Sequence, residues 1–226
     1  MNVWLLPQRT EWARSSQATL PAPALDRPGA QAVKRCLDVL VAGIGLVLLA
    51  PLLVLIAVAV RAETRGPALF RQRRVGRGCR EFVMWKFRTM VADAEDRRAA
   101  LLALSCDPDW LDIEDDPRVT RLGRLLRRTS LDELPQLVNV LRGDMSLVGP
   151  RPLIPVDHAR VPAWAQRRYA VKPGITGLWQ IRGRTTLSFG EMVWLDHVYV
   201  ATWTLRRDVT ILLRTLPAVL SGHGAK

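Results

Sequence analysis

An uninterrupted apolar run, residues 37–60, constrains the fold of this chain more than any other feature. It carries one charged residue, Asp38, near its start. As an α-helix the run would extend about 36 Å, at roughly 1.5 Å per residue, which is enough to cross the hydrocarbon core of a bilayer. A single membrane-spanning helix is therefore the simplest interpretation.

A proline in the middle of the run predicts a bend. Pro51 has no backbone N–H to donate, and its ring crowds the carbonyl oxygen of Val47, so a helix through this position kinks. We therefore expect the bend at Ala50 and Pro51.

Both flanks of the run are basic, and this favours a re-entrant helix over a spanning one. Basic flanks prefer the cytoplasmic side of a membrane. A spanning helix satisfies one flank, whereas a helix that enters, bends and returns satisfies both. The sequence thus predicts a re-entrant membrane helix over residues 33–61, after a loose leader (1–32) without a signal-peptide core. The flanking basic residues are Lys34, Arg35, Arg61 and Arg65.

The chain is strongly basic, with 33 Lys+Arg against 21 Asp+Glu and a net charge of +12. Nearly all of this charge is arginine (29 Arg, 4 Lys). Arginine binds phosphate through a planar fork, although a genomic preference for arginine codons would enrich it as well. The candidate partners are nucleic acid, anionic lipid and a phosphorylated small molecule.

Three scattered cysteines, Cys36, Cys79 and Cys106, exclude a zinc-ligand spacing. Their odd number also argues against a disulfide scaffold and fits reduced thiols in the cytosol.

After the apolar run, two β-prone segments predict a hairpin. Residues 68–75 and 79–87 flank Gly76-Arg77-Gly78, a three-residue turn. Between Arg61 and Arg88 there are nine basic residues and two acidic ones. Such a basic segment beside a membrane helix attracts anionic lipid headgroups.

The remaining chain is mainly helical. We expect an amphipathic helix over 91–104, a loop over 105–117, and helices over about 189–201 and 203–220. The last two either lie on the bilayer surface, where tryptophan is favoured, or pack as core helices. The tryptophans concerned are Trp164, Trp179, Trp194 and Trp203.

The predicted fold class is α+β, mainly α. A re-entrant membrane helix, a small β-hairpin and interfacial amphipathic helices surround a compact cytosolic catalytic domain over 62–222, and residues 223–226 form a tail.

Four arginines recur at helical spacing with no acidic residue among them: Arg121, Arg124, Arg127 and Arg128. A solvated helix face normally intersperses opposite charges, so this pattern indicates an anion outside the chain.

An adjacent carboxylate pair, Asp132-Glu133, follows this helix. Its structural interpretation is a helix start, with Ser130 and Glu133 as a capping box, or with Asp132 as the N-cap and Pro135 in the first turn. Its functional interpretation is a nucleophile toward phosphorus and a ligand pair for Mg²⁺, which takes few protein oxygens and otherwise water and phosphate.

Gly149-Pro150-Arg151-Pro152 is a rigid segment. Each proline fixes its own φ, and Pro152 biases Arg151 toward an extended backbone. The guanidinium therefore loses little conformational entropy when it binds a ligand.

Taken together, these motifs resemble the bacterial sugar transferase family of monotopic polyprenol-phosphate phosphoglycosyl transferases. The resemblance covers residues 33–222 and preserves the family order. The matching segments are Lys34-Arg35 with Asp38, Pro51, RGPALFRQRRVG (65–76), WKFRTM (85–90), TRLGRLLRRTSLDELPQLVNVLRGDMSLVGPRPL (120–153) and YAVKPGITGLWQIRGR (169–184).

The resemblance implies transfer of a sugar 1-phosphate from a UDP-sugar to polyprenol (undecaprenyl) phosphate, with UMP released. By match, Asp132 is the nucleophile that forms a covalent phosphosugar intermediate, and Glu133 assists it and helps to hold Mg²⁺. Substrate-binding roles fall by match on Lys86, Arg88, Arg127 and Arg151, the last between Pro150 and Pro152.

The resemblance also implies a monotopic enzyme of the bacterial inner membrane, with its catalytic domain on the cytoplasmic side. Anionic lipids would be partners, and the sequence leaves open whether the chain forms a homo-oligomer. Two positions depart from the family pattern. Ala50 stands where serine often precedes the proline, and Arg206-Arg207 occupy a stretch that is usually more apolar.

Two other functions fit part of the sequence. A nucleic-acid-binding membrane protein fits the charge, but no stacking aromatic pattern or helix-turn-helix is present, and Asp132-Glu133 would repel phosphate backbones. A silent membrane scaffold is disfavoured by the intact carboxylate pair. The sequence leaves the sugar and the glycan pathway undefined.

Overall fold

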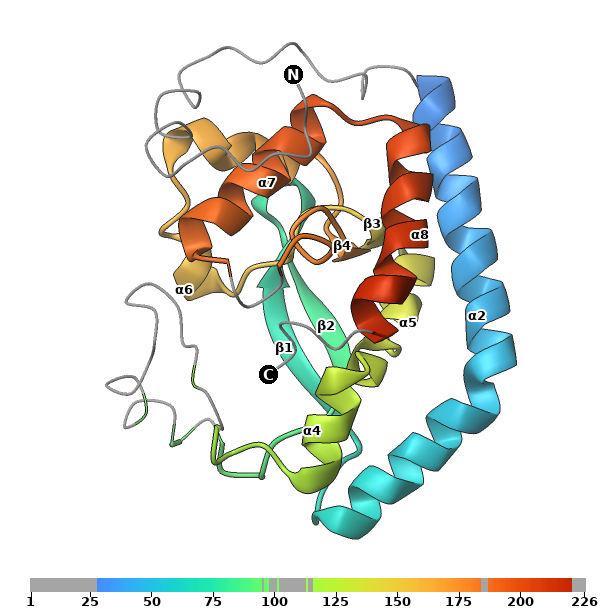
Figure 1. Cartoon of the computed structure of the whole chain (residues 1–226), viewed down its shortest axis with the longest axis vertical. Coiled ribbons are helices and arrows are strands. Elements are labelled where there is room, and N and C mark those ends of the chain that lie inside the picture. Colours follow the sequence, from blue (N-terminus) through green and yellow to red (C-terminus); the bar gives the residue numbers. More distant parts are fainter. Residues whose placement is uncertain are drawn as a thin grey trace.

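The computed structural model of the chain describes residues 28–94, 96–97, 101, 113, 116–183 and 187–220. The tail predicted over 223–226, most of the leader and half of the helix predicted over 91–104 lie outside these residues. The prediction of a helix is wrong for the described residues 92–94 and 96–97, which form turns, while residue 101 is helical. Figure 1 shows one long helix along the edge of the molecule, a β-hairpin through its middle and the C-terminal helices in the upper half of the view.

The long edge helix is α2, Pro28–Glu63, and it contains Pro51. It starts five residues before the predicted boundary, with proline at its first position, where the missing N–H costs nothing. Figure 1 shows that α2 is bent along its length, as expected for a helix with an internal proline. By length and composition α2 could cross a membrane. Whether it spans or re-enters stays a prediction.

Most of the apolar surface of α2 is exposed. Only Asp38, Ala42, Ile56 and Val60 are buried along the helix. Its outward residues include Val47 and Leu48, at 74% and 73% exposure. A helix that is apolar on all sides and buried on only one needs an environment other than water for its remaining surface.

The hairpin is formed by β1 (Leu69–Val75) and β2 (Glu81–Phe87), paired antiparallel from Leu69↔Phe87 to Val75↔Glu81. The turn is five residues, 76–80, not three as predicted. Gly78 and Cys79 both have positive φ, 65° and 59°, which a strand does not allow. The second strand therefore begins after Cys79.

The helices α4 (Arg121–Arg128) and α5 (Gln136–Arg142) flank a short 3₁₀ turn, η4 (Leu131–Glu133). The side chain of Thr120 caps α4 by accepting from the N–H of Gly123. The helix α5 packs on α2, where a methyl group of Leu137 lies close to Gly45.

A second, parallel pair of strands, β3 (Ser146–Val148) and β4 (Gly174–Thr176), lies beneath α8. Between these strands come α6 (Pro155–His158) and the 3₁₀ segment η5 (Ala163–Ala170). The loop that follows β3 carries Gly149-Pro150-Arg151-Pro152, so the strand pair sets where that loop begins.

The C-terminal helices are α7 (Phe189–Ala201) and α8 (Leu205–Leu220). The helix α7 has the predicted bounds and begins with a capping box formed by Ser188 and Glu191. The helix α8 starts two residues later than predicted, because the hydroxyl of Thr204 accepts from the N–H of Arg207 and so caps the first turn.

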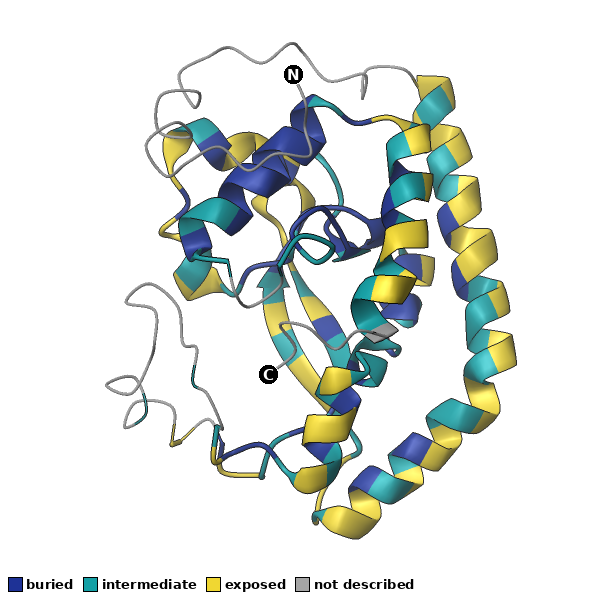
Figure 2. Cartoon of the chain, in the orientation of Figure 1, coloured by how far each residue is buried: buried dark blue, intermediate teal, exposed yellow. Residues whose placement is uncertain are grey.

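Burial resolves the two interpretations of the tryptophan-rich helices for α7. Figure 2 shows α7 as almost continuously buried, in contrast to α2. Trp179, Trp194 and Trp203 are 5%, 6% and 2% exposed. They pack in the core, so the bilayer-surface interpretation is wrong for α7. By contrast, α8 keeps Leu213 and Leu216 exposed.

The charged N-terminal part of α2 is docked onto the rest of the protein. Lys34 Nζ lies 2.6 Å from Asp208 Oδ2, and Asp38 accepts from the N–H of Leu147 in β3 at 3.0 Å. The guanidinium of Arg35 donates to carbonyls at the end of α5. These charges fix the register of α2 against the strand that precedes the Pro-Arg-Pro loop.

Candidate active site

The carboxylate pair lies in η4, directly after α4. Ser130 adopts a left-handed backbone (φ 55°) and makes no side-chain capping hydrogen bond. Asp132 lies inside the 3₁₀ turn, and α5 begins only at Gln136, after Pro135. Both capping interpretations of this segment are therefore wrong, although Pro135 does stand where its missing N–H is harmless.

Asp132 is buried, at 7% exposure, in a site rich in cations. The pKa of Asp132 is raised to about 6, mainly by burial and to a smaller extent by the charge of Glu133, while Lys86 and Arg127 act in the opposite direction. The carboxyl group is therefore mostly ionised at neutral pH and is poised to titrate just below it.

Lys86 reaches the pair from β2. Its Nζ lies 2.7 Å from Glu133 Oε1 and 4.0 Å from Asp132 Oδ2. Side chains alternate along a strand, so Lys86 points to the face opposite its neighbour Trp85. The structure thus brings Lys86, Asp132 and Glu133 together from two separate segments.

Arg127 is the one arginine of α4 turned toward the carboxylates. Its Nε donates to Thr89 Oγ1 at 3.0 Å, and its charge interacts with Asp132. Burial lowers the pKa of Arg127, and the charge of Asp132 opposes that shift. The other arginines of the predicted anion-binding face, Arg121, Arg124 and Arg128, are exposed.

Arg151 approaches the pair from the loop after β3, between the buried Pro150 and Pro152. Its guanidinium stacks on Trp179, 4.4 Å from the ring centroid. Burial lowers the pKa of Arg151, and the charge of Glu133 is the strongest opposing influence. Arg151 therefore belongs to the same electrostatic cluster as Asp132.

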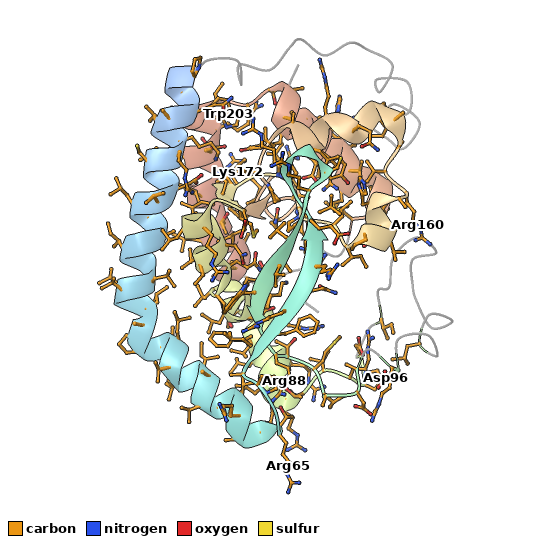
Figure 3. All side chains as sticks on the ribbon, turned by 180° about the vertical axis from the view of Figure 1, so that it is seen from behind. Arg65, Arg88, Asp96, Arg160, Lys172 and Trp203 are labelled. Carbon is orange, nitrogen blue, oxygen red and sulfur yellow. The ribbon has the colours of Figure 1, made fainter. Side chains whose placement is uncertain are left out.

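Arg88 lies elsewhere. Its guanidinium donates to the carbonyls of Thr64 and Arg65, at 2.8 and 3.0 Å, and so closes the C-terminal end of α2. Figure 3 shows Arg88 close to Arg65 at this end of the molecule. Gly66, with φ 117°, leaves room for the guanidinium. A role of Arg88 in substrate binding stays a prediction. The predicted bend residues, Ala50 and Pro51, are exposed on α2.

The sequence did not single out Arg168 or Asp196, which lie behind Arg151. Arg168 Nη2 is 2.5 Å from Asp196 Oδ2, and it also donates to the carbonyl of Arg151 at 2.6 Å. An aspartate in the middle of a largely apolar helix is the signal that could have found this pair, because a buried carboxylate needs a partner.

Among the described residues, no cluster of three or more His, Cys, Asp or Glu side chains could hold a metal ion. Asp132 and Glu133 supply two adjacent carboxylates. This donor set fits Mg²⁺, which binds through one or two carboxylates and completes its coordination with water and substrate phosphates.

The chemistry available here follows from these contacts. A buried carboxylate with a pKa of about 6, next to a lysine and two arginines, can act as a nucleophile in a cationic environment. Such a site suits attack on the phosphorus of an anionic phosphoanhydride.

The chain is similar to proteins of a known family. A family model described as "Bacterial sugar transferase" matches residues 29–222. The UDP-glucose:undecaprenyl-phosphate glucose-1-phosphate transferase of Caulobacter vibrioides is 44% identical over 218 residues, which cover 91% of this chain and 76% of that protein.

Other relatives differ in length. The galactosyl transferase CpsE of Streptococcus agalactiae is 45% identical over 85% of this chain, but the chain spans only 43% of that protein. The exopolysaccharide production protein ExoY of Rhizobium meliloti is 38% identical, over 88% of this chain and 90% of its own length.

Proposed function

The chain belongs to the bacterial sugar transferase family, and from this premise we propose that it is a phosphoglycosyl transferase. It moves a sugar 1-phosphate from a UDP-sugar to undecaprenyl phosphate and releases UMP. This reaction is the first membrane step in assembling a bacterial glycan.

The observation that carries the proposal is the placement of Asp132. The site combines a buried carboxylate, a neighbouring glutamate, and cations from a strand, a helix and a rigid loop: Lys86, Arg127 and Arg151. A dianionic diphosphate could approach a carboxylate only if such cations offset the repulsion.

The proposed chemistry has two displacements at one phosphorus. A carboxylate oxygen of Asp132 attacks the sugar-linked phosphorus, and the bond from that phosphorus to the bridging oxygen breaks. UMP leaves with the bridging oxygen, and an aspartyl-phosphosugar remains. An oxygen of undecaprenyl phosphate then attacks the same phosphorus, and the Asp132 carboxylate is regenerated.

The surrounding residues have separate proposed tasks. Lys86 holds Glu133 and limits the repulsion between the two carboxylates. Arg127 and Arg151 bind the phosphate oxygens and stabilise the charge that shifts toward UMP. Asp132 and Glu133 would hold Mg²⁺, which supplies further neutralisation of the diphosphate.

The exposed apolar surface of α2 supports a membrane anchor beside this site. In the proposal α2 enters the cytoplasmic leaflet, bends at Pro51 and returns, so that the acceptor phosphate at the headgroup level can reach Asp132. The exposed basic residues near its C-terminal end, including Arg61, Arg65 and Arg71, would bind anionic lipids.

A donor-panel assay tests the function. The full chain in vesicles with undecaprenyl phosphate and Mg²⁺ is given a series of UDP-sugars, and UMP release and lipid-linked sugar are measured. Release of UMP with stoichiometric lipid product supports the proposal. No UMP release with any donor overturns it.

The topology of α2 needs its own test. Cys36 is exposed near the start of α2, and a cysteine introduced at Arg65 reports on the other flank. Labelling of both positions by an impermeant reagent from one side only supports a re-entrant helix. Labelling from opposite sides shows that α2 spans the membrane.

A further inference from the structure

One buried ion pair holds both backbone polar groups of Arg151. Arg168 in η5 and Asp196 in α7 are joined at 2.5 Å, and each side chain is 1% exposed. The same guanidinium nitrogen of Arg168 donates to the carbonyl of Arg151 at 2.6 Å, and Asp196 Oδ2 accepts from the N–H of Arg151 at 3.3 Å. The pair therefore clamps this residue from two directions.

The clamp acts on a residue whose conformational freedom is already low. Pro150 and Pro152 fix the backbone on either side of Arg151. Trp179 lies under the guanidinium at 4.4 Å, and the charge of that guanidinium interacts with Glu133 and Asp132. Hydrogen bonds thus join the ion pair to the backbone of Arg151, and charge interactions join the guanidinium of Arg151 to the two carboxylates.

Fold stability alone is a poor explanation for this pair. The desolvation of two buried charges offsets much of their attraction, and well-packed apolar residues often do as well. Asp196 Oδ1 is buried and has no hydrogen-bond partner in the described part of the chain. What an apolar replacement could not supply is direction. Nη2 of Arg168 donates to a carboxylate and to a carbonyl together, through N–H bonds whose directions are fixed by the plane of the guanidinium.

We infer that Arg168 and Asp196 are positioning residues for the transfer reaction: they set the backbone of Arg151 so that its guanidinium faces the phosphates of the donor at Asp132. The inference rests on the proposed function for its kinetic consequences. A displacement of about 1 Å in such a group can cost about 100-fold in rate.

Three variants separate the contributions. Asp196→Ala removes the acceptor for both Arg151 and Arg168, and we expect kcat/KM for the donor to fall about 100-fold. Asp196→Asn keeps an acceptor oxygen without the charge, and we expect it to restore activity to within about tenfold of wild type. Arg168→Lys keeps the charge but not the fork, and we expect a loss of about 30-fold.

Val193→Ala on α7 is the matched structural control. Val193 is fully buried on the same helix and belongs to the apolar core. It should lower stability while leaving kcat/KM per folded enzyme unchanged. If Arg168→Lys and Asp196→Ala lose stability in the same way but keep kcat/KM within about twofold, the inference is wrong.

Hydrogen exchange gives a readout that does not depend on activity. Prolines flank Arg151, so its N–H is the only backbone amide in residues 150–152. Asp196→Ala should accelerate exchange at this amide, Asp196→Asn less so, and Val193→Ala not at all. Unchanged exchange in Asp196→Ala overturns the positioning role.

The two proposals can fail separately. A wild-type protein that releases no UMP from any donor overturns the proposed function, while the exchange rates still test the clamp. If Asp196→Ala does not fold, Asp196→Asn and Arg168→Lys carry the test, and wild-type kinetics with wild-type exchange in both would overturn the inference.

Discussion

Asp132 and Asp196 are two buried aspartates whose pKa values are raised alike but whose distances to their cationic partners differ. Both side chains are largely shielded from solvent, and burial raises the pKa of each to about 6. Asp196 is held 2.5 Å from the guanidinium of Arg168, whereas the ion pair from Lys86 to Asp132 is 4.0 Å long.

The difference shows that burial and charge do not define the role of a carboxylate. Asp196 Oδ2 forms a short ion pair and accepts a hydrogen bond from a backbone N–H, so both interactions hold it in a structural role. Asp132 Oδ2 lies 4.0 Å from Lys86 Nζ, which is beyond hydrogen-bond distance, and the proposed mechanism uses this carboxylate to attack phosphorus. We therefore assign chemistry to Asp132 and positioning to Asp196.

The largest expected effect comes from removing the nucleophile. Asp132→Asn should reduce turnover and covalent labelling by donor to below about one per cent of wild type, because the amide cannot form the acyl phosphate. Glu133→Gln should lose most activity. Asp93→Asn, in the exposed pair with Arg97, is the control and should be silent. More than about one per cent activity in Asp132→Asn rules out the nucleophile.

Arg151 interacts with both aspartates, so its replacement tests their connection. Arg151→Lys keeps a positive charge but cannot reproduce the fork or the stacking on Trp179. We expect kcat/KM to fall about 30-fold, from the loss of one or two charge-assisted hydrogen bonds in the transition state. Arg142→Lys, at an exposed stacking position over Trp85, should retain activity. Equal kinetics for the two variants would remove Arg151 from the site.

Replacing Asp196 should lower the free energy of unfolding more than replacing Asp132, which is the reverse of the order expected for activity. Asp196→Ala leaves the buried Arg168 without its carboxylate and should lower the free energy of unfolding by about 3 kcal/mol. Asp132→Ala should not lower it, since Lys86 keeps Glu133 and a costly buried charge is removed. Denaturant unfolding at pH 7.5 measures both. A greater loss in Asp132→Ala would contradict the comparison.

The smallest expected effect is the change of kcat/KM with pH. The pKa of Asp132 is raised, so its carboxylate becomes protonated as pH falls through about 6. Activity should be full near pH 7.5, and kcat/KM should fall about tenfold for each pH unit below about 6. Asp196 titrates in the same range, so Asp196→Asn distinguishes the two groups. The acid limb persists in this variant if Asp132 causes it and disappears if Asp196 does.

Motifs close together in the sequence identified the candidate site best. Asp132 and Glu133 stood out because adjacent acids follow an arginine-rich helix, and Arg151 because prolines flank it, whereas the family resemblance selected Arg127 among the four arginines of that helix. The contacts of Lys86 bring it to the carboxylates, while the contacts of Arg88 do not. Lys86 lies in β2 and Arg88 directly after it. Both are basic and they are two residues apart, so the sequence alone did not distinguish them.

Local conformation was predicted less well than element type. The hairpin, α4 and α7 were expected, yet the capping interpretations of η4 were wrong. A capping box needs the serine in extended backbone, and Ser130 is left-handed. The same Ser-x-x-Glu spacing does form a box at Ser188 and Glu191. Tertiary contacts therefore chose between two equal local patterns.

The sequence by itself determined the apolar run with its proline, the carboxylate pair and the rigid Pro-Arg-Pro loop, because these depend on residue type and short spacing. Only the tertiary structure decided that α7 is a core helix while α2 keeps an exposed apolar surface, since two helices that are apolar on all sides look alike until packing partners are known. It alone joined Arg168 to Asp196 behind Arg151, because buried charges find partners through space and not along the chain.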